Sequence, residues 1–133
     1  MAEPMQVEVV SADRVIWSGP STNIIAKTAD GEIGILPGHA PVLAVLQPSA
    51  VVIFGEDGTR EVVAVDGGFL SVAQGRVSVL SEYARMADEV SVAQAEKQLA
   101  EAQRVLDSGD GRDEHRQNFL RATAQLRAAQ KAQ

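Results

Sequence analysis

The chain has 133 residues, a net charge of −6 and no cysteine, with 45% hydrophobic and 23% charged residues. This composition is typical of a globular protein with room for a small domain and an appendage, and it excludes disulfides and thiolate chemistry. No stretch approaches the roughly 20 apolar residues of a membrane-spanning helix, and the acidic charge disfavours nucleic acid as a partner.

Residues 5–81 are predicted to form short β-strands. β-Branched runs such as Val51–Phe54 and Glu61–Val65 flank a turn at Gly55-Glu-Asp-Gly58, and Gln74-Gly75 marks a second hairpin turn. Short strands with regularly spaced turns favour a sandwich or flattened barrel. We therefore predict a β-sandwich domain over residues 1–86.

The pattern changes near residue 87, and residues 87–133 are predicted to form an antiparallel helical hairpin. Ser91 is a candidate N-cap with Gln94 as its capping-box partner, and Ser108-Gly-Asp-Gly111 separates two helices at about 91–107 and 113–130. Two helical stripes alternate large and small side chains: Val92, Ala95, Leu99, Ala102 and Leu106, then Phe119, Ala122, Leu126 and Ala129. Because alanine buries little area, we expect the hairpin to be marginally stable and able to leave the β domain.

Charge is unevenly distributed along the chain. Residues 1–89 hold twelve acids and five bases, whereas every charged residue after Glu114 is basic. Four basic residues of the second helix fall within a sector of about 100° at helical spacing: Arg112, Arg116, Arg127 and Lys131. This basic face fits either an acidic protein surface or solvent.

The inventory of reactive residues is small. The two histidines are His39, in a turn between apolar segments, and His115, in the first turn of a polar helix where we expect it to be solvated. Two distant histidines without cysteine cannot supply a zinc site, and no phosphate-binding loop is present. The sequence predicts no catalytic residue, no metal and no cofactor.

The most distinctive stretch runs from Gly31 to Leu43 and combines an apolar strand with three glycines and two prolines. It resembles the signature of the epsilon subunit of the proton-translocating ATP synthase. Residues 10–19, 65–72 and 76–84 resemble further segments of that family, in the same order. The resemblance covers nearly the whole β region.

The resemblance implies a sandwich of about ten strands, followed by the helical hairpin. It also implies a non-catalytic subunit of the central stalk, at the cytoplasmic face of the cell membrane, which binds the gamma subunit and the ring of c subunits. The ring-facing turn is then Gly31, Glu32, Ile33 and Gly34, and the remaining signature residues are Ile35, Leu36, Pro37, Gly38 and His39. The basic face would meet an acidic segment of the beta subunit when the hairpin extends into the catalytic head of alpha and beta subunits and restrains ATP hydrolysis.

One motif departs from the family pattern. Many bacterial members bind ATP through Ile-Asp-x-x-Arg-Ala, and the matching positions here are Val90, Ser91, Gln94 and Ala95. Glutamine has no charge with which to hold a phosphate. We therefore expect ATP to bind weakly or not at all.

Two other readings remain open from the residues alone. The first is a free-standing protein-binding adaptor with the same fold. The second is a small hydrolase that uses His39, although an activated nucleophile beside that base is not evident in the sequence.

Overall fold

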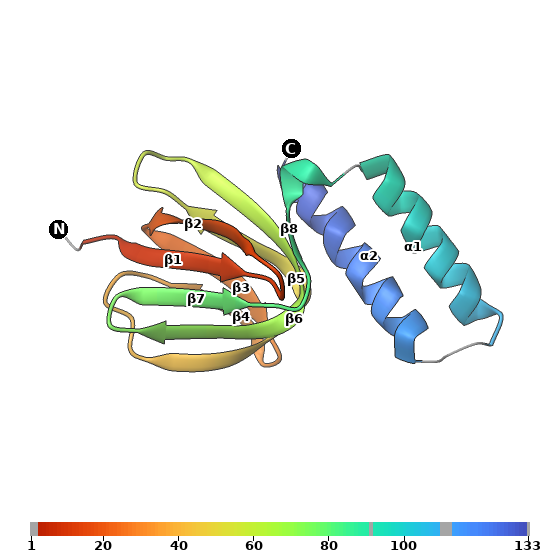
Figure 1. Cartoon of the computed structure of the whole chain (residues 1–133), viewed down its shortest axis with the longest axis horizontal. Helices are drawn as coiled ribbons and strands as arrows, with labels where there is room; N and C mark the ends of the chain where they lie inside the picture. Colours follow the sequence, from red (N-terminus) through yellow and green to blue (C-terminus); the bar gives the residue numbers. More distant parts are fainter. Residues whose placement is uncertain (1–2, 91, 110–112, 133) are drawn as a thin grey trace.

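The computed structural model describes residues 3–90, 92–109 and 113–132, which form a β-sandwich followed by two helices (Figure 1). The elements are β1 (Met5–Val10), β2 (Val15–Ser21), β3 (Asn23–Thr28), β4 (Gly31–Ile35), β5 (Val42–Phe54), β6 (Arg60–Ala73), β7 (Arg76–Leu80), β8 (Ala84–Met86), the 3₁₀ turn η1 (Ala87–Glu89), α1 (Val92–Asp107) and α2 (Asp113–Ala132).

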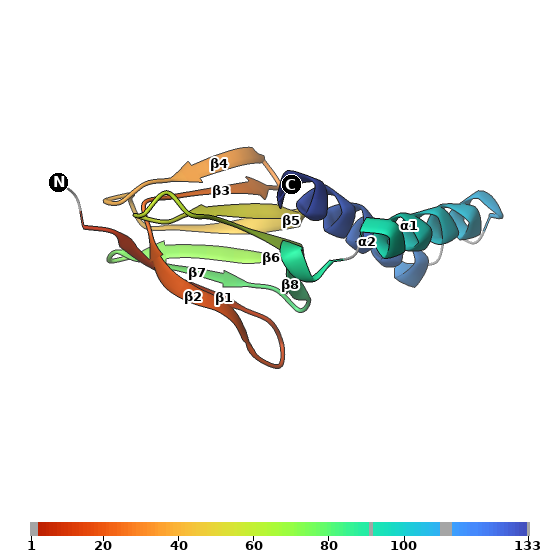
Figure 2. The same ribbon diagram turned by 90° about the horizontal axis from the view of Figure 1, so that it is seen from above.

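The strands form one sheet that folds over into two layers, in the order β2-β1-β7-β6-β5-β3-β4, with β8 paired to β6 (Figure 2). β5 and β6 have 13 and 14 residues and run through both layers. The described residues therefore hold eight strands where about ten were expected, because each of these two long strands supplies a segment to each layer. The predicted β-sandwich with an appended helical hairpin is confirmed.

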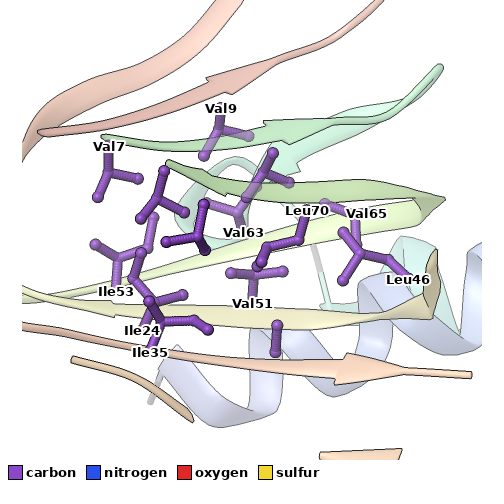
Figure 3. Packing of buried hydrophobic residues seen from close by; sticks show 14 of the residues in the cluster. Val7, Val9, Ile24, Ile35, Leu46, Val51, Ile53, Val63, Val65 and Leu70 are labelled. Carbon is purple, nitrogen blue, oxygen red and sulfur yellow. The ribbon is translucent and has the colours of Figure 1, made fainter. Parts of the chain in front are cut away.

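The core between the layers follows from alternation along the strands. In β1, Met5, Val7 and Val9 are buried while Gln6 and Glu8 point to solvent. The inward residues of the other strands complete one aliphatic cluster, whose members include Ile24, Ile35, Leu46, Val51, Ile53, Val63, Val65 and Leu70 (Figure 3).

Both predicted hairpin turns are confirmed. Gln74 and Gly75 have φ values of 52° and 75°, as the two central residues of a type I′ turn require. In the other turn, the Asp57 carboxylate accepts hydrogen bonds from the Thr59 hydroxyl at 2.6 Å and the Thr59 backbone N–H at 3.2 Å. These bonds lower the pKa of Asp57.

The helices lie side by side as an antiparallel pair (Figure 1). Ala95 and Ala102 of α1 and Ala122 and Ala129 of α2 are buried, as the alternating stripes predict. A second face of α2 covers the outside of the sheet, where Ala128 joins a small apolar cluster with residues of β5 and β6. The sequence interpretation did not foresee this second face.

Gly68 gives a stability prediction for this fold. Its φ is +109°, and a Cβ there would lie 2.0 Å from the Leu80 carbonyl oxygen, so the backbone of two strands must shift. Gly68→Ala should lower the free energy of unfolding by about 3 kcal/mol or more. Gly58 has a φ of +82° but open space around it, so Gly58→Ala should cost only about 1 kcal/mol. Urea unfolding measures both, and equal losses would contradict the steric argument.

Candidate functional site

The two histidines, the candidate bases of the sequence, lie in different parts of the structure. His39 is exposed, and its Nδ1 lies 2.7 Å from the carbonyl oxygen of Ala40, its neighbour in the chain. His115 is half-buried on α2 and lines a cavity, so the expectation that it is solvated was wrong. Across residues 3–90, 92–109 and 113–132, no cluster of His, Cys, Asp and Glu side chains could hold a metal ion.

A continuous row of apolar side chains crosses the outer face of one layer. Cross-strand pairing places Val45 beside Phe69, Phe69 beside Leu80, Leu80 beside Val10, and Val10 beside Val15. Directly paired residues share one face of a sheet, so these five form a single row over β5, β6, β7, β1 and β2. Val45 is 54% exposed, Phe69 49% and Leu80 46%. We call this set the apolar row.

The next row of side chains on the same face carries little charge. Ser18, Glu8, Ser78, Ser71 and Leu43 pair in sequence across the same five strands, and Glu8 is the one acid among them. Leu43 is 71% exposed and widens the apolar surface at the β5 side. Contiguous exposed apolar surface with few charges is typical of a protein-binding face.

Sequence reasoning missed the apolar row, although a signal was present. Phe69-Leu70 in β6 and Val79-Leu80 in β7 are consecutive apolar pairs. Leu70 and Val79 enter the core, so Phe69 and Leu80 lie on the outer face. Such pairs indicate that a strand has apolar side chains on both faces.

The predicted ring-facing turn lies next to the apolar row. The chain turns at Ala29 and Asp30, and Gly31 to Gly34 form the start of β4 rather than the turn itself. The turn closes earlier because the Thr28 hydroxyl donates to the Gly31 carbonyl at 2.8 Å and accepts from the Asp30 backbone N–H at 3.1 Å. Ala29 N–H donates to the Val45 carbonyl at 2.9 Å, which joins this turn to the end of the row.

The signature residues are divided between core and surface. Glu32 is exposed and pairs across the strands with Lys27, whereas Ile33 packs against the core. An open groove of about 430 Å³ has Glu32 and Ile33 on one wall and Leu43 and Val45 on the other. Ile35 is fully buried, and the chain then leaves the sheet through Leu36, which is 58% exposed, Pro37, Gly38 and His39. The signature therefore fixes a strand end and exposes the segment after it.

The basic face is present on α2 where the structure describes it. Arg116, Arg127 and Lys131 are exposed, and Arg112 lies outside the described residues. The structure thus leaves three cations of one helical sector open to solvent on the hairpin.

A second cavity of about 510 Å³ lies between the two helices and is also lined by the strand end that precedes them. Its lining includes Tyr83, Gln94, Gln98, Glu101, His115 and Arg121. Gln94, the position of the family's arginine, therefore faces this cavity, while Ser91 lies outside the described residues. Neither helix, over the residues described, is both long and apolar enough to cross a membrane.

Comparison with known proteins matches these features to one family. The family described as "ATP synthase, Delta/Epsilon chain, beta-sandwich domain" matches residues 4–87. An ATP synthase epsilon chain of Streptomyces coelicolor is 43% identical over 129 residues, which cover 97% of this chain and 98% of that one. An epsilon chain of Cutibacterium acnes is 52% identical over 95 residues, 71% of this chain and 65% of the other.

Solved structures share the fold. A chain of the Euglena gracilis mitochondrial ATP synthase, in an assembly of OSCP, F1 and c-ring, aligns with a TM-score of 0.74 and 22% identity over 99% of this chain and 82% of that one. A chain of the Tetrahymena thermophila mitochondrial ATP synthase central stalk and c-ring aligns with a TM-score of 0.60 and 18% identity, over 98% and 97%. The family match spans more than half of the chain, and the Streptomyces match spans nearly all of it. This chain therefore belongs to the ATP synthase delta/epsilon chain family.

Proposed function

We propose that this chain is a non-catalytic rotor subunit of the proton-translocating ATP synthase, held at the cytoplasmic face of the cell membrane by its partners. It links the gamma subunit to the ring of c subunits, and it couples proton flow to ATP synthesis in the catalytic head. The observation that carries the proposal is the apolar row, which ends beside the turn that precedes Glu32. One side of the sandwich thus offers two adjoining contact surfaces.

The apolar row is the proposed docking face for gamma. Five neighbouring strands present it, so it is held rigidly and loses little conformational entropy when a partner binds. Phe69 lies between Val45 and Leu80 and is the one aromatic side chain of the row, and aromatic side chains contribute strongly to interface energies. The neighbouring row of side chains has a single charge, so a partner can bind here without desolvating several charged groups.

The turn beside Glu32 and the groove next to it form the proposed contact with the c-ring. Glu32 is exposed, and the groove joins it to Leu43 and Val45. A ring contact here would be continuous with the gamma contact, as a linker between two rotor parts requires.

The helical hairpin is the proposed regulatory part, separate in function from the β-sandwich. Its exposed cations Arg116, Arg127 and Lys131 complement an acidic segment of the beta subunit. The β-sandwich retains its own core without the helices, because every member of the large aliphatic cluster comes from the first 84 residues. The hairpin can therefore move without unfolding the part that stays on the rotor.

Replacing Phe69 tests the docking face. Phe69→Ser should weaken binding to gamma by at least about 30-fold, or about 2 kcal/mol, because it removes the one aromatic contact of the row. The free energy of unfolding should change by less than about 1 kcal/mol, since the side chain is half exposed in the free protein. Calorimetric titration with gamma measures the first quantity. Leu120→Ser, at a similarly exposed leucine on α2, is the control and should leave binding unchanged. Equal affinities for the two variants would refute the docking face.

Hydrolysis of ATP by the reconstituted catalytic head tests the regulatory role. The full chain should slow hydrolysis, whereas a chain ended at Glu89 should bind the head equally well and not slow it. If both chains bind and neither slows hydrolysis, the hairpin has no inhibitory role. If neither binds, the assignment as a rotor subunit fails.

We further propose that the cavity between the helices does not hold ATP tightly. Gln94 presents an uncharged amide where a phosphate-binding arginine would be needed. Calorimetric titration of the full chain should show no binding at micromolar ATP. A dissociation constant in the micromolar range would contradict this prediction.

A further inference from the structure

Over the described residues, the hairpin packs against the β-sandwich mainly through α2. α1 packs against α2, and α2 packs against β5, β6 and η1. The residues of α2 on the sheet-facing side follow helical spacing, at Arg121, Ala124, Gln125 and Ala128. The two alanines bury little apolar area, so the polar residues must contribute strongly to holding the hairpin in place.

An ion pair joins this side of α2 to the sheet. The Nε and Nη2 atoms of Arg121 donate to Oδ2 of Asp66 at 3.1 Å and 2.8 Å. The Asp66 side chain is 6% exposed, and that of Arg121 is 38% exposed. Solvent therefore screens the arginine but hardly reaches the carboxylate.

Tyr83 completes the contact from the strand end before the helices. The Arg121 guanidinium lies 4.5 Å from the centre of the Tyr83 ring, and Gln125 Nε2 donates to the Tyr83 hydroxyl at 2.7 Å. Tyr83 is itself fixed, because its backbone carbonyl accepts from Asp66 N–H at 3.0 Å. Arg121 and Gln125, on neighbouring turns of α2, thus contact the same part of the β-sandwich, at Asp66 and Tyr83.

Because Asp66 is buried, the contact between α2 and the sheet depends strongly on Arg121. Oδ1 of Asp66 is buried and has no hydrogen-bond partner among the described residues, so Arg121 supplies the compensation for the charge. Removing one member of a buried pair leaves an uncompensated charge, whereas removing both members costs much less. If α2 leaves the sheet, water can reach the Asp66 carboxylate and solvate its charge. The unpaired acid therefore favours the released state of the hairpin.

We propose that Asp66, Tyr83, Arg121 and Gln125 form an ionic latch that sets the balance between a docked and a released hairpin. The Asp66–Arg121 pair is the part that decides this balance, and Tyr83 and Gln125 orient it. The consequence for hydrolysis rests on the proposed function, but the latch itself is a property of the isolated chain.

Spin labels on the full chain test the latch directly. The chain has no cysteine, so Glu56→Cys in the β5–β6 turn and Lys97→Cys on α1 can be labelled selectively at two exposed sites. Double electron–electron resonance then reports the distribution of distances between the β-sandwich and the hairpin. The parent chain should give one narrow population. Arg121→Gln should raise the released-to-docked ratio by about tenfold, the shift expected for an unpaired buried acceptor.

Two matched variants separate an ionic latch from simple loss of packing or charge. Arg127→Gln removes an exposed arginine from the same helix and should leave the distribution as in the parent chain. Asp66→Asn combined with Arg121→Gln removes both charges and should return the ratio most of the way to the parent value. If Arg121→Gln matches Arg127→Gln, or if the double variant releases the hairpin as much as Arg121→Gln alone, the latch is refuted.

Hydrolysis assays distinguish failure of the latch from failure of the regulatory role. If Arg121→Gln releases the hairpin in the isolated chain and alters inhibition of the reconstituted head, both proposals are supported. If it releases the hairpin and inhibition is unchanged, the latch stands and the regulatory role falls. If it does not release the hairpin, the latch falls whatever the hydrolysis rate.

Discussion

The pairing of β5 with β6 is the constraint on which the rest of the molecule depends. The two strands stay hydrogen-bonded from Val42 opposite Val72 to Phe54 opposite Arg60, through a bend where Gln47 and Gly67 are passed over. The bend turns one sheet into two layers, so the inner faces of the same two strands meet across the core. Neither layer can form separately, because each contains part of β5 and part of β6.

This arrangement gives the two outer faces different roles. The outer face of one layer is closed by α2 through Ala50, Val52, Val62 and Ala64, within the same chain. The outer face of the other carries the apolar row and is uncovered in the isolated chain. The chain thus buries one apolar outer face with its own helix and leaves another open, and this open face is the one proposed above for docking.

The local parts of this structure could be predicted from the sequence, and the non-local parts could not. The turn at Gln74-Gly75 and the alternating alanines of the two helices follow from residues close together in the chain. The Asp66–Arg121 pair joins residues 55 positions apart, and no periodicity connects them. The apolar row depends on the register of five strands, which hydrophobic pattern alone does not set. The family resemblance implied about ten strands, whereas the described residues form eight, because β5 and β6 each continue through the bend as one strand.

The bend in β6 also has a mechanical consequence. Asp66 and Phe69 flank Gly67 and Gly68, so the acid of the proposed latch and the aromatic residue of the proposed docking face are separated by two residues. Both glycines have positive φ, and the Leu80 carbonyl leaves no space for a Cβ at Gly68. Any displacement of Phe69 therefore reaches Asp66 over two residues of one strand, without an intervening loop. This corner is the shortest covalent path between the proposed docking face and the proposed latch.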